Sequence, residues 1–473
     1  MTGKVVIHWF QQDFRLTDNP ALYHATKLGP VLPLYLLDET EPKHLQAGAA
    51  SRVWLHHALH ALNNSLDQAL FVFKGAPITI LDTLITRYSI TDLCWNYRYE
   101  PWYENRDTKL ITWLKSRGIE IHLFNGTLLW KPGSIRKQDG QSYKVFTPFY
   151  RNGCLAAESP RSPLPSVGAL AQWIKPTNRL DIHSLALLPQ TRWDKTILSH
   201  WQIGESAARE KLKTFLKEPV HRYKVGRDLP AAAHTSRLST HLHFGELSVN
   251  QVWHAIQQLP QDMNTDCFLS QLGWREFSYN LLIHNPNLST ENLQSKFDAF
   301  PWSENQNHFQ AWQTGKTGIP MVDAGMRELW QTGYMHNRLR MIVGSFLVKN
   351  LRLDWRRGER WFWDCLVDAN LANNSASWQW VAGCGADAAP YFRVFNPIMQ
   401  GKKFDPGGHY IKRFVPELRT LPLKYLFSPW EAPSSILDEA GIQLGETYPR
   451  PIVDLKKSRL DALDAFSSLK TLR

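Results

Sequence analysis

Short apolar segments alternate with amphipathic segments over the first quarter of the chain. Five segments rich in β-branched and aromatic residues have the pattern of buried strands, and they cover residues 5–10, 31–38, 69–75, 91–97 and 119–124. The stretches between them, such as residues 51–68 and 105–118, carry apolar residues at helical spacing. This alternation predicts an α/β fold with a doubly wound parallel sheet. No GxGxxG motif follows the first segment, so a dinucleotide bound in the Rossmann manner is not expected.

The pattern changes after this region. Prolines and serines interrupt residues 152–193, which is typical of a long surface connector. Beyond it, apolar residues fall at helical spacing over residues 205–215, 247–259 and 320–348. We therefore expect an α/β domain over residues 1–130, a connector over 131–195 and an all-α domain over 196–473.

Charge and cysteine content narrow the function classes. Lys plus Arg is 54 and Asp plus Glu is 43, so the formal net charge is +11. Such a balance suggests nucleic acid as a partner, although a solvated basic surface is an equally ordinary explanation. The five cysteines form no CxxC pair, so no zinc or iron–sulfur site, and no other metal site, is expected. No signal peptide or membrane-spanning segment is recognisable, which predicts a cytoplasmic protein.

The richest chemistry lies in residues 334–397. Asn, Arg and Asp recur there at helical spacing beside many tryptophans, and the whole chain has 20 tryptophans. Apolar walls, amides and charges of this kind suit a buried, planar, anionic and redox-active cofactor.

Four blocks carry a resemblance to a known family. They are WFQQDFRLTDNPAL at residues 9–22, YKVFTPFYR at 143–151, RDLPAAAHTSRLSTHLHFGELS at 227–248, and the segment 334–397. Together they resemble the photolyase/cryptochrome family, most closely the class I and III type photolyases of cyclobutane pyrimidine dimers. The resemblance implies an antenna-type α/β domain, a helical domain that binds FAD and DNA, and a monomer that acts on UV-damaged DNA at the nucleoid.

The same resemblance assigns residues to FAD. Thr235, Ser236 and Ser239 would bind the diphosphate, where an ordinary helix cap is the alternative. Arg340 and Asp368 would flank the isoalloxazine as an ion pair, where a structural salt bridge is the alternative. Asn370 stands where the family usually has Asp, which removes one negative charge. The full expected set is Tyr223, Thr235, Ser236, Arg237, Leu238, Ser239, Phe268, Arg275, Asn337, Arg340, Asp368, Asn370 and Asn374, with Asn374 opposite flavin N5.

Three tryptophans match the family's electron-transfer triad. From the flavin outward they are Trp378, Trp355 and Trp302. A role in packing is the alternative for each indole.

The substrate residues follow from the same comparison. Trp274 and Trp380 would be the aromatic walls around a flipped lesion, with Asn337 near the base edges and Met341 near the ring methyl groups. Phosphates of the DNA would be bound by Arg227, Arg275, Arg338, Arg393, Lys402 and Lys403.

One position departs from the cyclobutane-type pattern. Gln271 stands where these photolyases usually carry Glu, and (6-4) photolyases have Gln there. The motif MHNRLRM at residues 335–341 is nevertheless of the cyclobutane type. The resemblance implies a lyase in which photoexcited reduced FAD passes an electron to the dimer. A cryptochrome-type photoreceptor and a photolyase of single-stranded DNA are the alternatives.

An antenna chromophore stays open. The folate-binding Asn-Glu pair of one branch does not recur in YEPWYENRD at residues 99–107, where Trp102 and Tyr103 stand instead. Leu288 and Ser289 replace a Cys-Lys pair. Methenyltetrahydrofolate, a deazaflavin, FMN or no antenna all agree with the sequence.

Overall fold

The structure is a computed structural model, and it describes residues 4–168, 171–177, 181–388, 390–391 and 393–469. The chain forms two compact units. The first unit contains residues up to 221 together with 236–286, and the second contains 222–235 and the residues from 287 onward. The domain boundaries expected at residues 130 and 195 stay a prediction.

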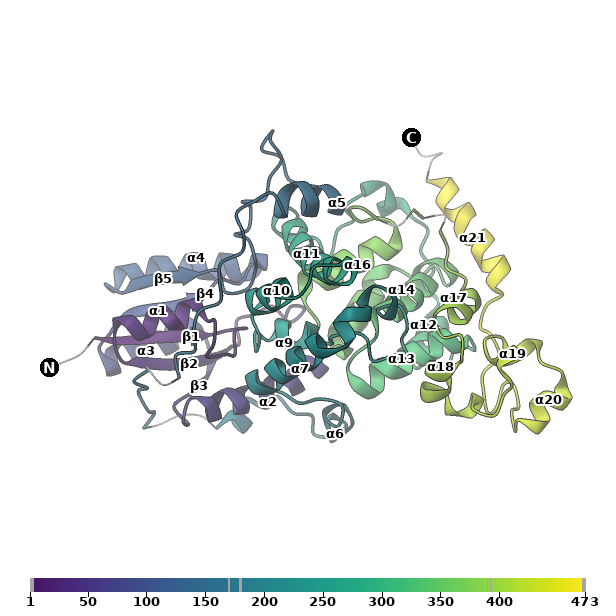
Figure 1. The fold of residues 1–473 in the computed structure, drawn as a ribbon, viewed down its shortest axis with the longest axis horizontal. Helices are drawn as coiled ribbons and strands as arrows, with labels where there is room; N and C mark the ends of the chain where they lie inside the picture. The colour runs from purple at the N-terminus through teal and green to yellow at the C-terminus, as the bar shows by residue number, and fades with distance from the viewer. Residues whose placement is uncertain (1–3, 169–170, 178–180, 389, 392, 470–473) are drawn as a thin grey trace. The chain divides into compact units, whose positions relative to one another are not determined.

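A five-stranded sheet forms the centre of the first unit (Figure 1). All pairs are parallel and the strand order is β3-β2-β1-β4-β5, so the prediction of a doubly wound parallel sheet is confirmed. Each strand overlaps a segment expected from the sequence. The strands are β1 (Val5–Phe10), β2 (Val31–Asp38), β3 (Phe71–Gly75), β4 (Ile90–Asn96) and β5 (Glu120–Phe124).

Helices of the first unit cover the sheet and continue beyond it. Right-handed crossovers place α1 and α2 on one face and α3 and α4 on the other, and the core on that second face joins strand residues such as Trp9 and Trp95 to Leu84 and Leu110 of α3 and α4. The elements are α1 (Pro20–Leu28), α2 (Ala49–Ser65), α3 (Pro77–Tyr88), α4 (Pro101–Ser116), α5 (Phe146–Pro148), η1 (Phe149–Cys154), η2 (Ile182–Leu185), α6 (Asp194–Leu198), α7 (Glu205–Lys217), α9 (Ser239–His243), α10 (Val249–Gln257) and α11 (Met263–His284). The short η3 (Pro219–Arg222) ends where the second unit begins in the sequence.

The expected connector is attached to the sheet. The backbone of residues 172–174 pairs with Val31 through two hydrogen bonds of 2.8 Å, and Trp173 forms a parallel bridge with Val31. β3 pairs with β2 only from Leu34 onward, so the connector occupies the place beside the start of β2 that β3 leaves open. Closer to its start, the connector is held by Asp18, whose carboxylate pairs with Arg161 and accepts from the N–H of Leu164.

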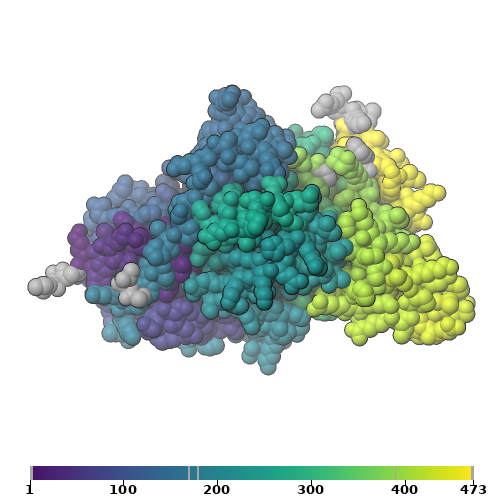
Figure 2. Space-filling model, viewed as in Figure 1, coloured from purple at the N-terminus to yellow at the C-terminus, as the bar shows by residue number. Residues whose placement is uncertain are grey.

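The loop before α5 is mostly exposed. Residues 131–145 stand out from the surface as a steel-blue projection at the top of Figure 2. Lys131, Arg136, Lys137 and Lys144 are exposed in this loop, and Asp139 is its one acidic residue. The loop therefore carries net positive charge.

The second unit is helical around one large core. Its buried centre includes Trp312, Trp355, Trp378, Phe362 and Tyr410. The elements are α8 (Tyr223–Gly226), η4 (Ser295–Ala299), α12 (Gln306–Gln313), α13 (Pro320–Thr332), α14 (Asn337–Ser345), η5 (Phe346–Asn350), α15 (Trp355–Cys365), α16 (Leu371–Ala382), α17 (Pro397–Phe404), α18 (His409–Phe414), η6 (Pro416–Leu418), α19 (Leu423–Leu426), η7 (Pro429–Glu431), α20 (Ser434–Glu439) and α21 (Leu455–Ser468).

The helical stretch expected over residues 320–348 is broken in two. α13 ends at Thr332 because Gly333 adopts a left-handed conformation with φ of 67°. The chain then turns and begins α14, where the imidazole of His336 accepts from the N–H of Arg338. The break separates the apolar α13 from the residues expected to bind cofactor and substrate, which begin with Asn337.

Within the described residues, no helix is both long enough and apolar enough to cross a membrane.

Candidate flavin and substrate site

The expected site residues fall in both compact units. Those in the first unit are Ser236, Arg237, Leu238, Ser239, Phe268, Gln271, Trp274 and Arg275. Those in the second unit are Tyr223, Arg227, Thr235, Trp302, Asn337, Arg338, Arg340, Met341, Trp355, Asp368, Asn370, Asn374, Trp378, Trp380, Arg393, Lys402 and Lys403.

Helix α11 positions the aromatic wall expected in the first unit. Asp262 and Thr265 form a capping box that fixes the start of this helix. About three turns along the helix, the half-buried ring of Trp274 stacks on Phe146, with ring centroids 3.8 Å apart and an interplanar angle of 11°. Phe146 belongs to the block at residues 143–151, and its place beside Trp274 could not be read from the sequence.

Two other side chains of α11 are engaged with backbone carbonyls. The amide of Gln271 donates to the carbonyl oxygen of Cys267 and to the hydroxyl of Ser270, both at 3.0 Å. The guanidinium of Arg275 donates to the carbonyl oxygen of Thr127 at 2.8 Å. The roles expected for Gln271 and Arg275 stay predictions, and any contact with a ligand would compete with these bonds. Phe268 is buried on the same helix and packs against Phe215.

The expected phosphate-binding segment is not an ordinary helix cap. Helix α9 begins at Ser239, which is exposed, and no side chain caps its start. The hydroxyl of Ser236 instead accepts from the N–H of Leu238 at 3.3 Å, and Arg237 adopts a left-handed conformation with φ of 51°. The alternative of a Ser/Thr cap is therefore not what these side chains form. Thr235 is half-buried in the second unit.

Helix α14 gathers four expected residues in the second unit. Asn337 and Met341 lie one turn apart, and the amide nitrogen of Asn337 is 3.9 Å from the sulfur of Met341. Asn337 is exposed and Met341 is half-buried, so an amide and a soft sulfur are both presented on this helix. Arg338 pairs with Asp228 at 2.7 Å.

The expected ion pair of Arg340 and Asp368 is present. One nitrogen of the guanidinium lies 2.9 and 2.8 Å from the two carboxylate oxygens, and Nε donates to the carbonyl oxygen of Met335 at 2.8 Å. Burial lowers the pKa of Arg340, but the carboxylate of Asp368, together with Tyr334 and Glu328, brings about a net rise of that pKa. Arg340 is thus a permanent cation held in one orientation.

Asn374 is held by a residue that the sequence did not single out. The amide nitrogen of Asn374 donates to the carbonyl oxygen of Glu359 at 3.0 Å and to its carboxyl group at 3.2 Å. The hydroxyl of Ser375 donates to the same carboxyl oxygen at 3.1 Å. Burial raises the pKa of Glu359 to about 7, against the hydrogen bonds from Ser375 and Asn374, which lower it. In the sequence, Glu359 stands one turn after Trp355 among several arginines. This pattern is typical of an exposed helix face, so it does not indicate that Glu359 is buried.

Asn370 caps the helix that carries Asn374. Its side-chain oxygen accepts from the N–H of Asn373 at 3.1 Å at the start of α16. The cap is therefore formed by Asn370, which leaves the side chain of Asn374 inside the helix free of any capping role. A role of Asn370 toward the flavin stays a prediction.

The three tryptophans expected to carry electrons come from segments that contact one another. Ser303, next to Trp302, donates its N–H to the carbonyl oxygen of Arg352 at 2.7 Å and bridges to Leu353, two residues before Trp355. One turn after Trp355, Gly358 lies so close to Trp378 that an added Cβ would be 2.2 Å from its ring. Trp378 and Trp355 are buried, whereas Trp302 is partly exposed. The expected electron-transfer order Trp378, Trp355, Trp302 thus leads from buried indoles to a partly exposed one.

The remaining expected residues lie at different depths in the second unit. Tyr223 is buried, and Arg227 and Trp380 are half-buried. Arg393, Lys402 and Lys403 are exposed, the two lysines in the last turn of α17.

Comparison with known proteins places this geometry in a family. A family model described as "DNA photolyase" matches residues 6–167, and one described as "FAD binding domain of DNA photolyase" matches residues 268–468. A deoxyribodipyrimidine photo-lyase of Agrobacterium fabrum is 45% identical over 98% of this chain and 98% of its own. The chain belongs to the photolyase/cryptochrome family.

Other members of the photolyase/cryptochrome family are similar over nearly the full chain. A deoxyribodipyrimidine photo-lyase of Escherichia coli is 36% identical over 98% of both chains, and cryptochrome-1 of Arabidopsis thaliana is 34% identical over 99% of this chain and 71% of its own. A crystal structure of a class III photolyase from Agrobacterium tumefaciens superposes with a TM-score of 0.95 at 43% identity, covering 100% of this chain and 98% of the other. These comparisons confirm the expected family and fold, with FAD as its cofactor.

The residues present fit FAD. The amide of Asn374 and the ion pair of Arg340 and Asp368 supply hydrogen-bonding groups for the edge of a planar ring. Two buried nitrogens at the start of α14, Nε2 of His336 and Nε of Arg338, have no hydrogen-bond partner among the described residues. Because Nδ1 of His336 accepts a hydrogen bond and burial lowers the pKa of this imidazole to about 4, Nε2 carries its proton and is a donor. A ligand rich in acceptors, such as FAD, suits both nitrogens.

The sheet of this photolyase/cryptochrome family member also has a topological switch point, between β1 and β4, where ligands of doubly wound folds bind. The residues that follow these strands line a small cavity of about 10 Å³. They include Asp13 after β1, and Asn96, Tyr97 and Arg98 at the end of β4 and after it. This volume holds about one water molecule, so a chromophore at this point would require side chains to move.

Proposed function

We propose that the protein is a light-dependent lyase that splits cyclobutane pyrimidine dimers in UV-damaged DNA. The observation that carries the proposal is the pair of Asn337 and Met341, which presents an amide and a sulfur 3.9 Å apart on the helix that also holds Arg340. An amide can address the polar edges of two linked pyrimidines, and a thioether suits their methyl groups.

Reduced FAD, when bound, would lend an electron to the dimer after it absorbs light and take it back once the ring bonds have split, so that no net redox change occurs. Arg340, whose orientation Asp368 fixes, would place a positive charge beside the ring and stabilise its reduced, anionic form. Asn374 would hydrogen-bond the ring at N5, and Glu359 keeps the amide of Asn374 in one orientation. Tyr223, Thr235, the segment Ser236–Ser239, Phe268 and Asn370 complete the proposed set.

Trp274 and Trp380 offer aromatic faces that replace the stacking a flipped lesion loses when it leaves the duplex. Arg227, Arg338, Arg393 and Lys402 bind phosphates around it, with Lys403 on the same helix as Lys402. Trp378, Trp355 and Trp302 pass electrons toward oxidised FAD and so restore the active form. This division of roles separates repair from reactivation.

The proposal also covers the oligomeric state, the cellular location and the antenna chromophore. We propose a monomer that works in the cytoplasm on nucleoid DNA, with an antenna chromophore that is methenyltetrahydrofolate, a deazaflavin or FMN if one is bound. Denaturing the purified protein and identifying the released chromophores by absorption and mass spectrometry tests the antenna.

A cryptochrome-type photoreceptor is the second candidate. It is favoured by Gln271, whose amide is bonded to its own helix and cannot protonate a substrate. Photoreduction of the flavin without repair would agree with this role.

A repair assay separates the two functions. The protein is reduced, mixed with duplex DNA that contains one cyclobutane dimer, and illuminated, with a dark sample as the control. Recovery of intact thymines by chromatography supports the lyase. Photoreduction of FAD without recovered thymines on either duplex or single-stranded DNA rejects it, and recovery on single-stranded DNA alone identifies a single-strand photolyase.

A further inference from the structure

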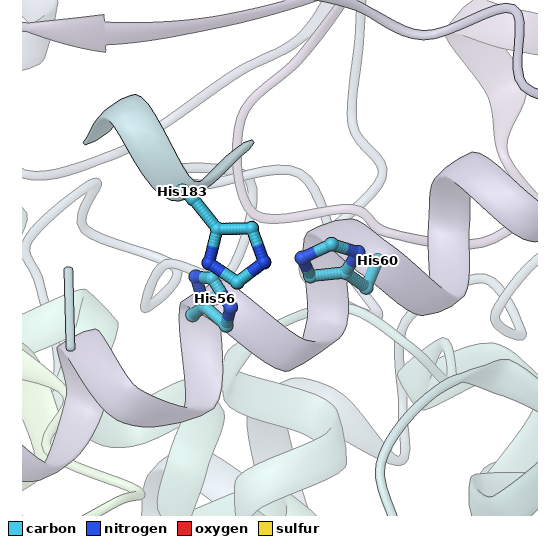
Figure 3. A group of neighbouring side chains, drawn as sticks. All are labelled: His56, His60 and His183. Carbon is cyan, nitrogen blue, oxygen red and sulfur yellow. The ribbon is translucent and has the colours of Figure 1, made fainter. Parts of the chain in front are cut away.

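Three histidines outside the flavin site converge in the first unit. His56 and His60 lie one turn apart on α2, and His183 lies in η2 of the connector (Figure 3). One ring nitrogen of each lies within 4.8 Å of those of the other two. The ring centroids are 4.7 Å apart for His56 and His60, 4.8 Å for His56 and His183, and 5.3 Å for His60 and His183.

The deepest of these imidazoles has an unsatisfied nitrogen. His56 is 2% exposed, and its Nδ1 has no hydrogen-bond partner among the described residues. A buried polar atom without a partner costs free energy, so its retention needs a reason. His60 is partly buried and His183 is exposed, which leaves a route from solvent to the cluster.

The cluster offers three imidazole nitrogens as donors, and burial affects two of them. Burial and the adjacent imidazoles of His57 and His60 lower the pKa of His56 to about 4. Burial also lowers the pKa of His60. An imidazole binds a metal through its neutral form, so the burial of His56 and His60 favours the form that a metal needs.

We propose that His56, His60 and His183 bind one divalent transition-metal ion of the zinc class through three imidazole nitrogens. The fourth position of the tetrahedron would be taken by water. Tetrahedral Zn²⁺ with bonds of about 2.1 Å needs nitrogens about 3.4 Å apart, so the ring nitrogens, which lie within 4.8 Å of one another, must approach by up to about 1.4 Å. His60 and His183 are the less buried members and can rotate. The nitrogen-only donor set excludes the oxygen-binding ions Mg²⁺ and Ca²⁺.

The site would fasten the connector to α2. A bond between these two segments already exists, because Arg52 of α2 donates to the carbonyl oxygen of Ala186 at 2.6 Å. Next to it, Asp181 caps η2 by accepting from the N–H of His183 at 3.1 Å, which orients the segment that carries the third ligand. A metal ion would add a second, stronger link at the same place. The expectation that no metal is bound rested on the lack of a CxxC pair, and this histidine cluster contains no cysteine.

Metal titration of the full-length, tag-free protein tests this inference. The protein is stripped with a chelator, dialysed, and titrated with ZnCl₂ against a chromophoric competitor. We expect one ion per chain, a rise of the Tm with zinc, and a tetrahedral Co²⁺ absorption spectrum. His60→Ala and His183→Ala should each weaken zinc binding at least about tenfold and abolish the Tm rise.

Two matched variants serve as controls. His57→Ala changes a histidine on the same helix outside the trio, and His44→Ala changes an exposed histidine before it. Both should bind zinc as the wild type does. The inference is overturned if His183→Ala, whose side chain is exposed and whose folding should be unaffected, binds zinc as tightly as the wild type. It is equally overturned if the stripped wild type binds no ion.

Discussion

Glu359 is a buried acid whose proton matters to the fold. Its side chain accepts hydrogen bonds from Asn374 and Ser375, yet burial raises its pKa from 4.5 to about 7. The folded protein therefore holds this proton more tightly than the unfolded chain. The resulting stability is fully present below pH 4.5 and is lost as the pH rises through about 7.

The substitution Glu359→Gln should remove the loss of folding stability that the wild type shows as the pH rises. The amide can still accept the hydrogen bonds but cannot ionise, so the decrease in the free energy of unfolding between pH 5 and pH 8 should shrink by about 3 kcal/mol. Denaturant unfolding at both pH values measures it. Glu304→Gln, on a side chain that is 89% exposed, is the control and should change nothing. An equal pH dependence in Glu359→Gln and the wild type would show that Glu359 is ionised in the fold.

Gln271 is the residue on which substrate chemistry depends. A carboxylate at this position has no N–H to donate to the carbonyl oxygen of Cys267, so it would be released from its own helix. Gln271→Glu should therefore raise the quantum yield of dimer repair, measured with the duplex assay above. Gln271→Leu also breaks the bond to Cys267 but carries no acid, and it should not raise the yield. An unchanged yield in Gln271→Glu, or an equal rise in Gln271→Leu, contradicts this interpretation.

The sequence identified some of these residues but not their supports. The ion pair of Arg340 and Asp368 was expected because both residues stand in family blocks, and its geometry agrees. Glu359 and Phe146 were not expected, because their importance comes from contacts with Asn374 and Trp274 that are distant in the sequence. Likewise, His56 and His60 have the spacing of metal ligands on one helix face, but their third partner, His183, lies over 120 residues further along the sequence.

Helices α15 and α16 pack at a glycine. A Cβ at Gly358 would lie 2.2 Å from the ring of Trp378 and 2.6 Å from Leu347. Gly358→Ala should therefore push the helices apart and lower the free energy of unfolding by about 1–3 kcal/mol, despite the better helix propensity of alanine. Gly344→Ala is the matched control, since its nearest contact is 3.1 Å from Val381. Thermal unfolding of both variants compares them, and equal stability would mean that Trp378 is free to move.

The same helices carry the proposed electron relay. Trp355→Phe keeps an aromatic ring in the core but removes the easily oxidised indole and its hydrogen bond to Asn292. Photoreduction of oxidised FAD should fall to a small fraction of the wild-type rate, while repair by protein that is already reduced should persist. Trp330→Phe, at a tryptophan that is 65% exposed, should leave both unchanged. Undiminished photoreduction in Trp355→Phe would remove this residue from the relay.

Elements were predicted best where one physical pattern dominates. The buried strands have continuous apolar runs, and all five strands overlap the predicted segments. The stretch over residues 320–348 was less readable, because helical spacing continues across Gly333 while the backbone turns there. The connector was expected only as a long surface segment, because backbone pairing with Val31 leaves no side-chain signal in the sequence.

At the scale of the whole molecule, net charge governs DNA binding. A formal charge of +11 and exposed cations such as Lys402 predict an affinity that falls steeply with salt. The logarithm of the DNA-binding constant falls linearly with the logarithm of the salt concentration, and Lys402→Ala should make this slope less negative by about one. Lys456→Ala, exposed on α21, is the control. Equal slopes in Lys402→Ala and the wild type, measured by fluorescence anisotropy with damaged duplex, would remove Lys402 from the interface.

The connector has a further consequence because it is anchored along its length. Arg161 and Leu164 bind Asp18, residues 172–174 extend the sheet beside Val31, and η2 lies against α2. If one peptide bond between these contacts were cut, both ends of the connector would therefore stay bound to the first unit. The two fragments would separate under denaturing conditions and still elute together in native buffer, so the chain could be expressed as two complementary halves that reassemble.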